Sequence, residues 1–172
     1  MDKQRESRKS VANAYFVLHV SQEAARELEA VQNEMSKLYN GVDRCLASPN
    51  TFHVTLVGAH AATKEDMTML MTALESFDLE IAEKTSSLKG LGSWKTSGGL
   101  YCLFAELRDP EVVVGVACAL SKHLIDRCGA NIDGCFGSSA SWVDVVTEDI
   151  FQPHCTIATV DPRTDGNVWQ SG

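Results

Sequence analysis

Apolar residues along the chain follow two different periods. Short stretches rich in β-branched and aromatic residues are typical of strands, whereas apolar residues repeating at positions i, i+3, i+4 and i+7 are typical of amphipathic helices. The chain alternates between the two patterns, which predicts a mixed fold of helices and strands. The predicted strands cover residues 14–20, 52–57, 100–107 and 153–158.

Each of the three predicted helices begins at a recognisable cap. Ser21 is an N-cap residue, Thr63 opens a capping box, and Asp109 is followed by a proline at the first helical position. Gly41 and Gly129 supply the stops of the first and third helices. All three helices carry an apolar stripe along one side and are therefore expected to pack against a sheet.

Four stretches have a less regular pattern. Residues 79–82 form a candidate strand, and residues 87–94 (SLKGLGSW) predict a turn punctuated by glycines, which indicate bends or a close approach of the backbone. Gly98 and Gly99 predict a second turn. Residues 130–150 combine small side chains with one large aromatic residue, which predicts a long loop or an irregular hairpin.

Two of the strands carry the same short motif. Residues 52–57 read FHVTLV and residues 153–158 read PHCTIA. Side chains at positions i and i+2 of a strand share one face, so each motif presents one imidazole and one hydroxyl, about 6 to 7 Å apart, opposite an aliphatic face. One His-x-Thr motif occurs easily by chance, but two such motifs in apolar strands indicate a common functional site.

The order of elements suggests two halves built alike, each contributing one motif strand. In that arrangement the two imidazoles would face each other across a groove. The length of 172 residues suits one domain or two small lobes that share a cleft. We expect a disordered tail over residues 1–11, a single domain over residues 12–160 and a second tail over residues 161–172.

The charge of the chain restricts its partners. A formal net charge of −8 and a sequence pI near 5.0 argue against a broad electrostatic grip on long duplex nucleic acid, which needs many Lys and Arg contacts to phosphate. A small anionic ligand held by a few donors stays allowed. The longest apolar runs fall short of the roughly 20 residues that a membrane span needs, so no membrane partner is expected.

The cysteines indicate a reducing compartment. The six cysteines include no Cys-x-x-Cys pair, and the first ten residues are polar and mixed in charge, unlike a secretory signal. We therefore expect buried or partly buried thiols in a cytoplasmic protein, with the nucleus as the alternative. No zinc site is expected, because the spacing of the cysteines fits none.

Two such histidines can act as one acid and one base near neutral pH. If a phosphodiester lies between them, one imidazole can remove a proton from the attacking hydroxyl or water. The other imidazole can then protonate the departing oxygen. The two threonine hydroxyls can donate to the non-bridging oxygens. No metal or other cofactor is expected, since the i+2 partner of each histidine is a threonine rather than a further ligand.

Other aromatic and histidine residues have weaker claims to a role. Trp94 could meet a nucleotide, or could simply cover the core from a turn. Trp142 could form a lid or a stacking surface over the site, since its loop leads directly into the second motif strand. We interpret His19 and His123 as surface or packing residues.

The motifs carry a resemblance to a known family. Residues 52–56 (FHVTL), residues 153–157 (PHCTI) and residues 88–94 (LKGLGSW) resemble the two-histidine phosphoesterase superfamily, also called LigT-like. Within it the chain is most similar to the central domain of A-kinase-anchoring proteins and to 2',5'-phosphodiesterases. The resemblance covers roughly residues 12–160. It implies an α+β fold with two lobes, two antiparallel sheets around a central cleft and helices outside.

The resemblance also implies an activity. The motif positions of the family fall on His53, Thr55, His154 and Thr156, which implies a metal-independent phosphodiesterase for 2',5'-oligoadenylate, related RNA phosphodiesters or 2',3'-cyclic phosphates. The alternative is a non-catalytic module that binds a nucleotide such as AMP. The expected partner is a small oligonucleotide or nucleotide, and the expected state is a monomer. Relatives often continue with a further helix and strand, so the sequence could be a fragment.

Overall fold

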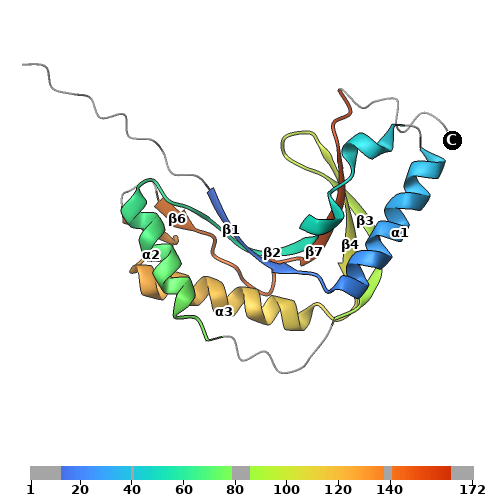
Figure 1. The fold of residues 1–172 in the computed structure, drawn as a ribbon. Coiled ribbons are helices and arrows are strands. Elements are labelled where there is room, and N and C mark those ends of the chain that lie inside the picture. The colour runs from blue at the N-terminus through green and yellow to red at the C-terminus, as the bar shows by residue number, and fades with distance from the viewer. Residues whose placement is uncertain (1–12, 40, 79–85, 138–140, 164–172) are drawn as a thin grey trace, which may run out of the picture. The chain divides into compact units, whose positions relative to one another are not determined.

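The computed structural model describes residues 13–39, 41–78, 86–137 and 141–163, and it is an α+β fold of three α-helices and antiparallel strands (Figure 1). The chain divides into two compact units. Unit 1 comprises Met1–Phe16, Leu56–Lys84 and Val113–Phe151, and unit 2 comprises Val17–Thr55, Thr85–Val112 and Gln152–Gly172. The predicted N-terminal tail, the candidate strand at residues 79–82 and residues 164–172 lie outside the described residues.

Unit 2 contains an antiparallel set of strands in the order β3-β4-β7-β2, and the helix α1. These elements are β3 (Leu88–Lys95), β4 (Tyr101–Leu107), β7 (His154–Val160), β2 (His53–His60, of which the first three residues belong to this unit) and α1 (Gln22–Leu38). Two 3-10 helices, Val42–Cys45 and Pro49–Thr51, connect α1 to β2. The predicted motif strands and the strand over residues 100–107 are thereby confirmed.

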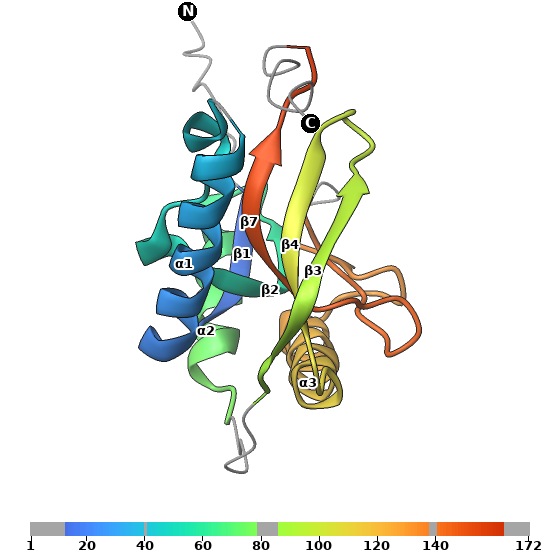
Figure 2. The same ribbon diagram turned by 90° about the vertical axis from the view of Figure 1, so that its right-hand side faces the viewer.

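Helix α1 begins where the sequence predicts. The hydroxyl of Ser21 accepts a hydrogen bond from the amide of Ala24 at 3.2 Å, which satisfies one of the free N–H groups of the first turn. Leu28 on its inner side is fully buried. The helix lies beside β7 (Figures 1 and 2), and a buried glutamine joins the two elements: Gln32 donates to the carbonyls of Ala47 at 2.8 Å and Ile157 at 3.0 Å.

Replacing Gln32 with leucine is expected to lower the free energy of unfolding by about 1–3 kcal/mol, because a buried acceptor is left without its donor. Gln32 is only 4% exposed, so water cannot take its place. Urea denaturation measures the change. The control is Asn33→Leu on the exposed side of the same helix, which should change stability by less than about 0.5 kcal/mol. Equal stability of the two variants would contradict the proposed role of Gln32.

Unit 1 contains the remaining described strands, in the order β2-β6-β5, with β1 also paired to β2. All seven described strands belong to one sheet, whereas the resemblance implies two sheets. The elements are β1 (Asn13–His19, which continues into unit 2), the rest of β2, α2 (Lys64–Glu75), α3 (Glu111–Cys128, which begins in unit 2), β5 (Cys135–Phe136) and β6 (Ser141–Val143). Helices α2 and α3 lie on one side of these strands (Figure 1).

The predicted irregular hairpin of residues 130–150 is confirmed as β5 and β6. Its second strand is fastened to the start of α2 by a buried serine. The hydroxyl of Ser141 donates to the carboxylate of Asp66 at 2.5 Å and accepts from the amide of Ala62 at 2.9 Å. The helix N-cap predicted at Thr63 also forms, since the amide of Asp66 donates to the hydroxyl of Thr63 at 3.1 Å.

The prediction of a turn over residues 87–94 was wrong, because this stretch is the strand β3. Its glycines occupy strand positions, and β3 pairs with β4 along its length. Gly92 is needed there: a Cβ atom at this position would lie 2.5 Å from two ring carbons of Phe104. The actual turn is the one predicted at Gly98 and Gly99, where Gly99 has a φ of +84°.

Two further features concern the helices and the cysteines. Within the described residues, no helix combines the length and the apolar character needed to cross a bilayer. All six cysteines are free thiols, and four of them are buried. Burial raises the pKa of the Cys155 thiol to about 11, so this side chain stays neutral and packs as an apolar group.

Candidate functional site

The two motif strands are direct neighbours in unit 2. Strands β2 and β7 pair antiparallel, with Val54 opposite Cys155. Continued by one residue in each direction, this register sets His53 opposite Thr156 and Thr55 opposite His154. The four polar side chains therefore share one face of the paired strands. This differs from the expectation of two imidazoles on opposite walls of a groove, because the motif strands pair with each other instead of lying in separate halves.

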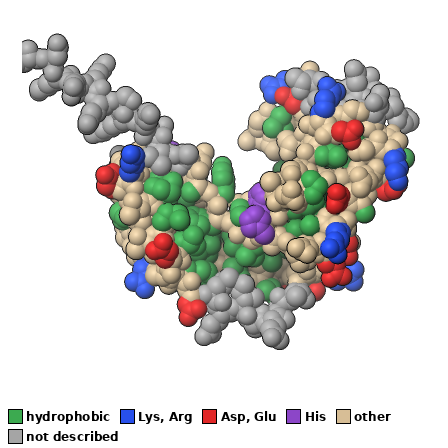
Figure 3. Space-filling view, in the orientation of Figure 1, with side chains coloured by type: hydrophobic (Ala, Val, Ile, Leu, Met, Phe, Trp, Pro, Cys, Tyr) green, Lys and Arg blue, Asp and Glu red, His purple; other side chains and the backbone are tan. Residues whose placement is uncertain are grey.

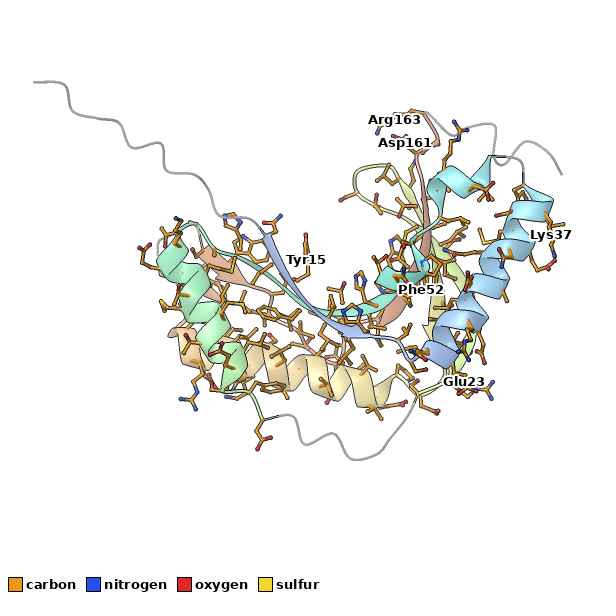
Figure 4. The ribbon with its side chains drawn as sticks, in the orientation of Figure 1. Tyr15, Glu23, Lys37, Phe52, Asp161 and Arg163 are labelled. Atoms are coloured by element: carbon orange, nitrogen blue, oxygen red, sulfur yellow. The ribbon has the colours of Figure 1, made fainter. Side chains whose placement is uncertain are left out.

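The other face of the motif strands is buried, as the alternation predicts. Phe52, Val54, Cys155 and Ile157 are at most 5% exposed, whereas the four motif side chains are only partly buried. Figure 4 marks Phe52 immediately before β2. Burial of these apolar neighbours fixes the register, because a slip by one residue would turn the whole polar set into the core.

Both imidazoles are held by the backbone in the same way. His53 Nδ1 lies 2.6 Å from the carbonyl of Thr51, and His154 Nδ1 lies 2.9 Å from the carbonyl of Gln152. A carbonyl can only accept, so Nδ1 carries the proton in the neutral ring and Nε2 carries the lone pair. Each histidine thus has the tautomer in which Nε2 can act as a base.

His154 is also packed by two aromatic rings. The ring centroid of Trp94 lies 4.3 Å from that of His154 at an interplanar angle of 82°, and the Phe104 centroid lies at 5.4 Å and 67°. Trp94 comes from β3, and Phe104 lies opposite Thr156 on β4. The strands β3 and β4 therefore build an aromatic wall beside the second motif.

The pKa of His154 lies below the ordinary value of an imidazole. The main cause is burial, which disfavours the charged ring, and the charge of His53 acts in the same direction. The hydrogen bond to the Gln152 carbonyl opposes both. His154 therefore stays neutral, and able to accept a proton near neutral pH, more readily than an ordinary imidazole.

Two further residues on β4, Glu106 and Cys102, face this site and were not predicted. Glu106 lies opposite His154, and its carboxylate is 3.7 Å from the ammonium of Lys89. Cys102 Sγ lies 3.6 Å from Thr156 Oγ1. The sequence shows that β4 is a strand, but its register against β7 comes only from the structure, so alternation alone could not single these side chains out.

Of the six predicted site residues, five lie in unit 2 and one lies elsewhere. Trp142 belongs to unit 1, where its ring stacks on His60 at a centroid distance of 6.1 Å and an angle of 23°. His60 Nδ1 in turn lies 2.9 Å from the side-chain oxygen of Asn13. The side chain of Tyr15, labelled in Figure 4, is 63% exposed in the same unit. The role of Trp142 as a lid stays a prediction.

The surface and the donor set agree with a ligand held by a few polar groups. On the face shown in Figure 3, Lys and Arg side chains are dispersed among acidic ones, and histidine side chains reach the surface. Among the described residues, no group of three or more His, Cys, Asp or Glu side chains is arranged to hold a metal ion. The site combines imidazoles, hydroxyls and aromatic rings with the carboxylate of Glu106 and the thiol of Cys102.

Comparison with known proteins agrees with the motif strands. No curated protein matches the chain. Residues 15–169 match the family described as "AKAP7 2'5' RNA ligase-like domain", a family of the two-histidine phosphoesterase, LigT-like type. The match spans both His-x-Thr motifs, and it confirms the resemblance that those motifs suggest. The chain therefore belongs to the AKAP7 2'5' RNA ligase-like domain family.

Proposed function

We propose that this protein is a metal-independent phosphodiesterase that cleaves 2',5'-oligoadenylate or related RNA phosphodiesters and opens 2',3'-cyclic phosphates. The observation that carries the proposal is the placement of His53, Thr55, His154 and Thr156 on one face of two paired strands. Both imidazoles have Nδ1 bound to a backbone carbonyl, so both have Nε2 available for proton transfer. Membership of the family supports the same reaction class.

The proposed reaction needs one base and one acid. We assign the base to His154, whose lowered pKa favours the neutral ring, and the acid to His53. His154 Nε2 takes the proton from the free 3'-hydroxyl, whose oxygen forms a bond to phosphorus. The bond between phosphorus and the 5'-oxygen of the next nucleotide breaks, and His53 gives that oxygen a proton. The products are a 2',3'-cyclic phosphate and a free 5'-hydroxyl.

The threonines stabilise the charge that develops during this step. Thr55 and Thr156 each place a hydroxyl beside an imidazole of the neighbouring strand. A hydroxyl can donate to a non-bridging oxygen, whose negative charge grows in the transition state. Partial burial strengthens such a hydrogen bond, because less water competes for the oxygen.

Turnover in the presence of excess EDTA tests the proposal. The purified protein is expected to convert 2',5'-linked triadenylate to 2',3'-cyclic products, and to open a 2',3'-cyclic nucleotide, at the same rate with and without the chelator. A 3',5'-linked triadenylate tests the linkage preference. Activity that disappears with EDTA and returns with a divalent cation would contradict the proposed chemistry.

The family match also favours a second candidate, a module that binds a nucleotide such as AMP without cleaving it. Calorimetry with AMP separates the two functions. Saturable binding together with no turnover of any of the three substrates would establish the module and exclude the enzyme. Turnover of at least one substrate would exclude the module.

Three finer features are part of the same proposal. The two-lobed arrangement around a central cleft is supported by the family match. A cytoplasmic or nuclear location is supported by six free thiols, which fit a reducing compartment. A monomer that takes a small oligonucleotide or nucleotide is supported by the net charge of −8, which disfavours long nucleic acid.

A further inference from the structure

Three aromatic side chains of unit 2, Trp94, Phe104 and the motif residue His154, form one cluster of contacting rings. The centroids of Trp94 and Phe104 lie 4.1 Å apart at 37°, and both rings contact His154 nearly edge to face. Such pairs contribute about 0.5–1.5 kcal/mol beyond the area that they bury. Phe104 is 9% exposed and is thus the inner member, with Trp94 packed against it.

A glycine makes room for this ring cluster. Because Gly92 has no side chain, the Phe104 ring lies directly against the backbone of β3, where a Cβ atom would meet Phe104 Cε2 and Cζ at 2.5 Å. Residues 92 and 94 of β3 share a face, so the place that Gly92 vacates is next to Trp94. Strand β3 therefore contacts the Phe104 ring with two residues of very different size, Gly92 and Trp94.

We propose that Trp94, supported by Phe104 and Gly92, is a positioning residue for His154: it fixes the plane of the imidazole and keeps water from one side of it. The base assignment of His154 rests on the proposed function, whereas the contact between the rings does not. Trp94 acts in this role through His154 and needs no contact with substrate.

Two effects of the aromatic wall on His154 have opposite signs. Exclusion of water disfavours the imidazolium and lowers its pKa, whereas attraction of a cation to the ring faces would raise it. Burial is the largest cause of the lowered pKa of His154, so we expect exclusion of water to be the larger of the two effects. The charged or titratable groups facing His154 from neighbouring strands are His53 on β2, Glu106 on β4 and Lys89, which pairs with Glu106, on β3.

An NMR titration of the His154 ring in Trp94→Ala tests the proposal. Water enters where the indole was, so the pKa of His154 is expected to rise toward its ordinary value of about 6.5. The ring signals should also broaden or shift, because the imidazole loses a contact at 4.3 Å. An unchanged or lower pKa would overturn the proposal, since the cation attraction or another group would then dominate.

Two more variants and one control keep the test independent of a folding defect. Trp94→Phe retains an aromatic ring and is expected to restore part of the lowered pKa. Gly92→Ala leaves Trp94 in place but must displace Phe104, so it should raise the pKa of His154 as well. The control is Leu91→Ala, which removes an apolar side chain, 57% exposed, from the same strand and should leave the titration unchanged.

Activity supplies a second readout. If Trp94 acts through His154, the acid limb of the kcat profile moves to higher pH in Trp94→Ala, and KM at alkaline pH stays unchanged. A KM raised at every pH with an unmoved limb would instead mean that the indole contacts substrate, and would overturn the positioning role. The titration does not need turnover. A protein that shows the pKa change but cleaves nothing would contradict the proposed function and leave the packing role of Trp94 intact.

Discussion

Replacing either His53 or His154 with alanine is expected to lower the rate of phosphodiester cleavage by about 10²–10⁴-fold, the usual contribution of one acid–base group. The two imidazoles act on the same phosphate in one step, so the double variant should lose little more than the worse single variant. Steady-state cleavage of 2',5'-linked triadenylate in excess EDTA measures both effects. Activity that survives either single change at the parent rate would remove the acid–base pair from the mechanism.

A matched control removes a different imidazole. His123 lies on α3, and its Nε2 atom is 2.9 Å from the carbonyl of Ala73 and 3.1 Å from the hydroxyl of Ser76. Ser76 is the C-cap residue of α2. The variant His123→Gln keeps a donor for these acceptors and should cleave at the parent rate. Urea denaturation of all variants shows whether a loss of rate reflects a loss of fold.

The second large effect concerns the hydroxyls. Thr55→Val and Thr156→Val keep the shape of the side chain and remove one donor each, so each is expected to lower kcat by about 10²–10³-fold. Valine suits a strand, and the contact that Thr156 loses is the weak one to Cys102 Sγ at 3.6 Å. The fold should therefore tolerate both changes. KM should change less than kcat, because the donated bond strengthens in the transition state.

Serine variants separate the hydroxyl from the methyl group. Thr55→Ser and Thr156→Ser keep the donor and should retain most of the rate. If the valine and serine variants lose the same fraction of kcat, the shape of the side chain matters and its hydrogen bond does not. That outcome would exclude the threonines as stabilisers of the transition state.

The local chemistry of the chain could be predicted from the sequence, because its signals act over a few residues. Ser21 and Thr63 cap the helices that they were expected to cap. The alternation at the motifs placed His53 and His154 on the polar side of their strands, with Val54 on the buried side. Each of these features depends only on side-chain type and a period of 2 or 3.6 residues.

The surroundings of the motifs could not be predicted, because they depend on strand pairs far apart in the chain. The pairing of Glu106 with His154 follows from the register of β4 against β7, which no local signal encodes. Glycine is ambiguous in the same way. The glycines of residues 87–94 indicate either a bend or a close approach of the backbone, and Gly92 is the second case, since it lies in the ladder between β3 and β4 and leaves space for Phe104. The sequence therefore predicts Trp94 in a turn, whereas it lies in β3.

The hydrogen bonds to Nδ1 of the two motif imidazoles do not depend on any other side chain. Their acceptors are peptide carbonyls, at residues 51 and 152, so no point substitution can delete the acceptor atom itself. The tautomer of each ring therefore depends on the path of the backbone before the strand and not on the identity of a partner side chain. Grafting the two motifs onto another antiparallel pair, in the same register and with the same approach of the chain, should reproduce the tautomer of both rings, whereas the plane of the His154 ring would also need the aromatic contacts of Trp94 and Phe104.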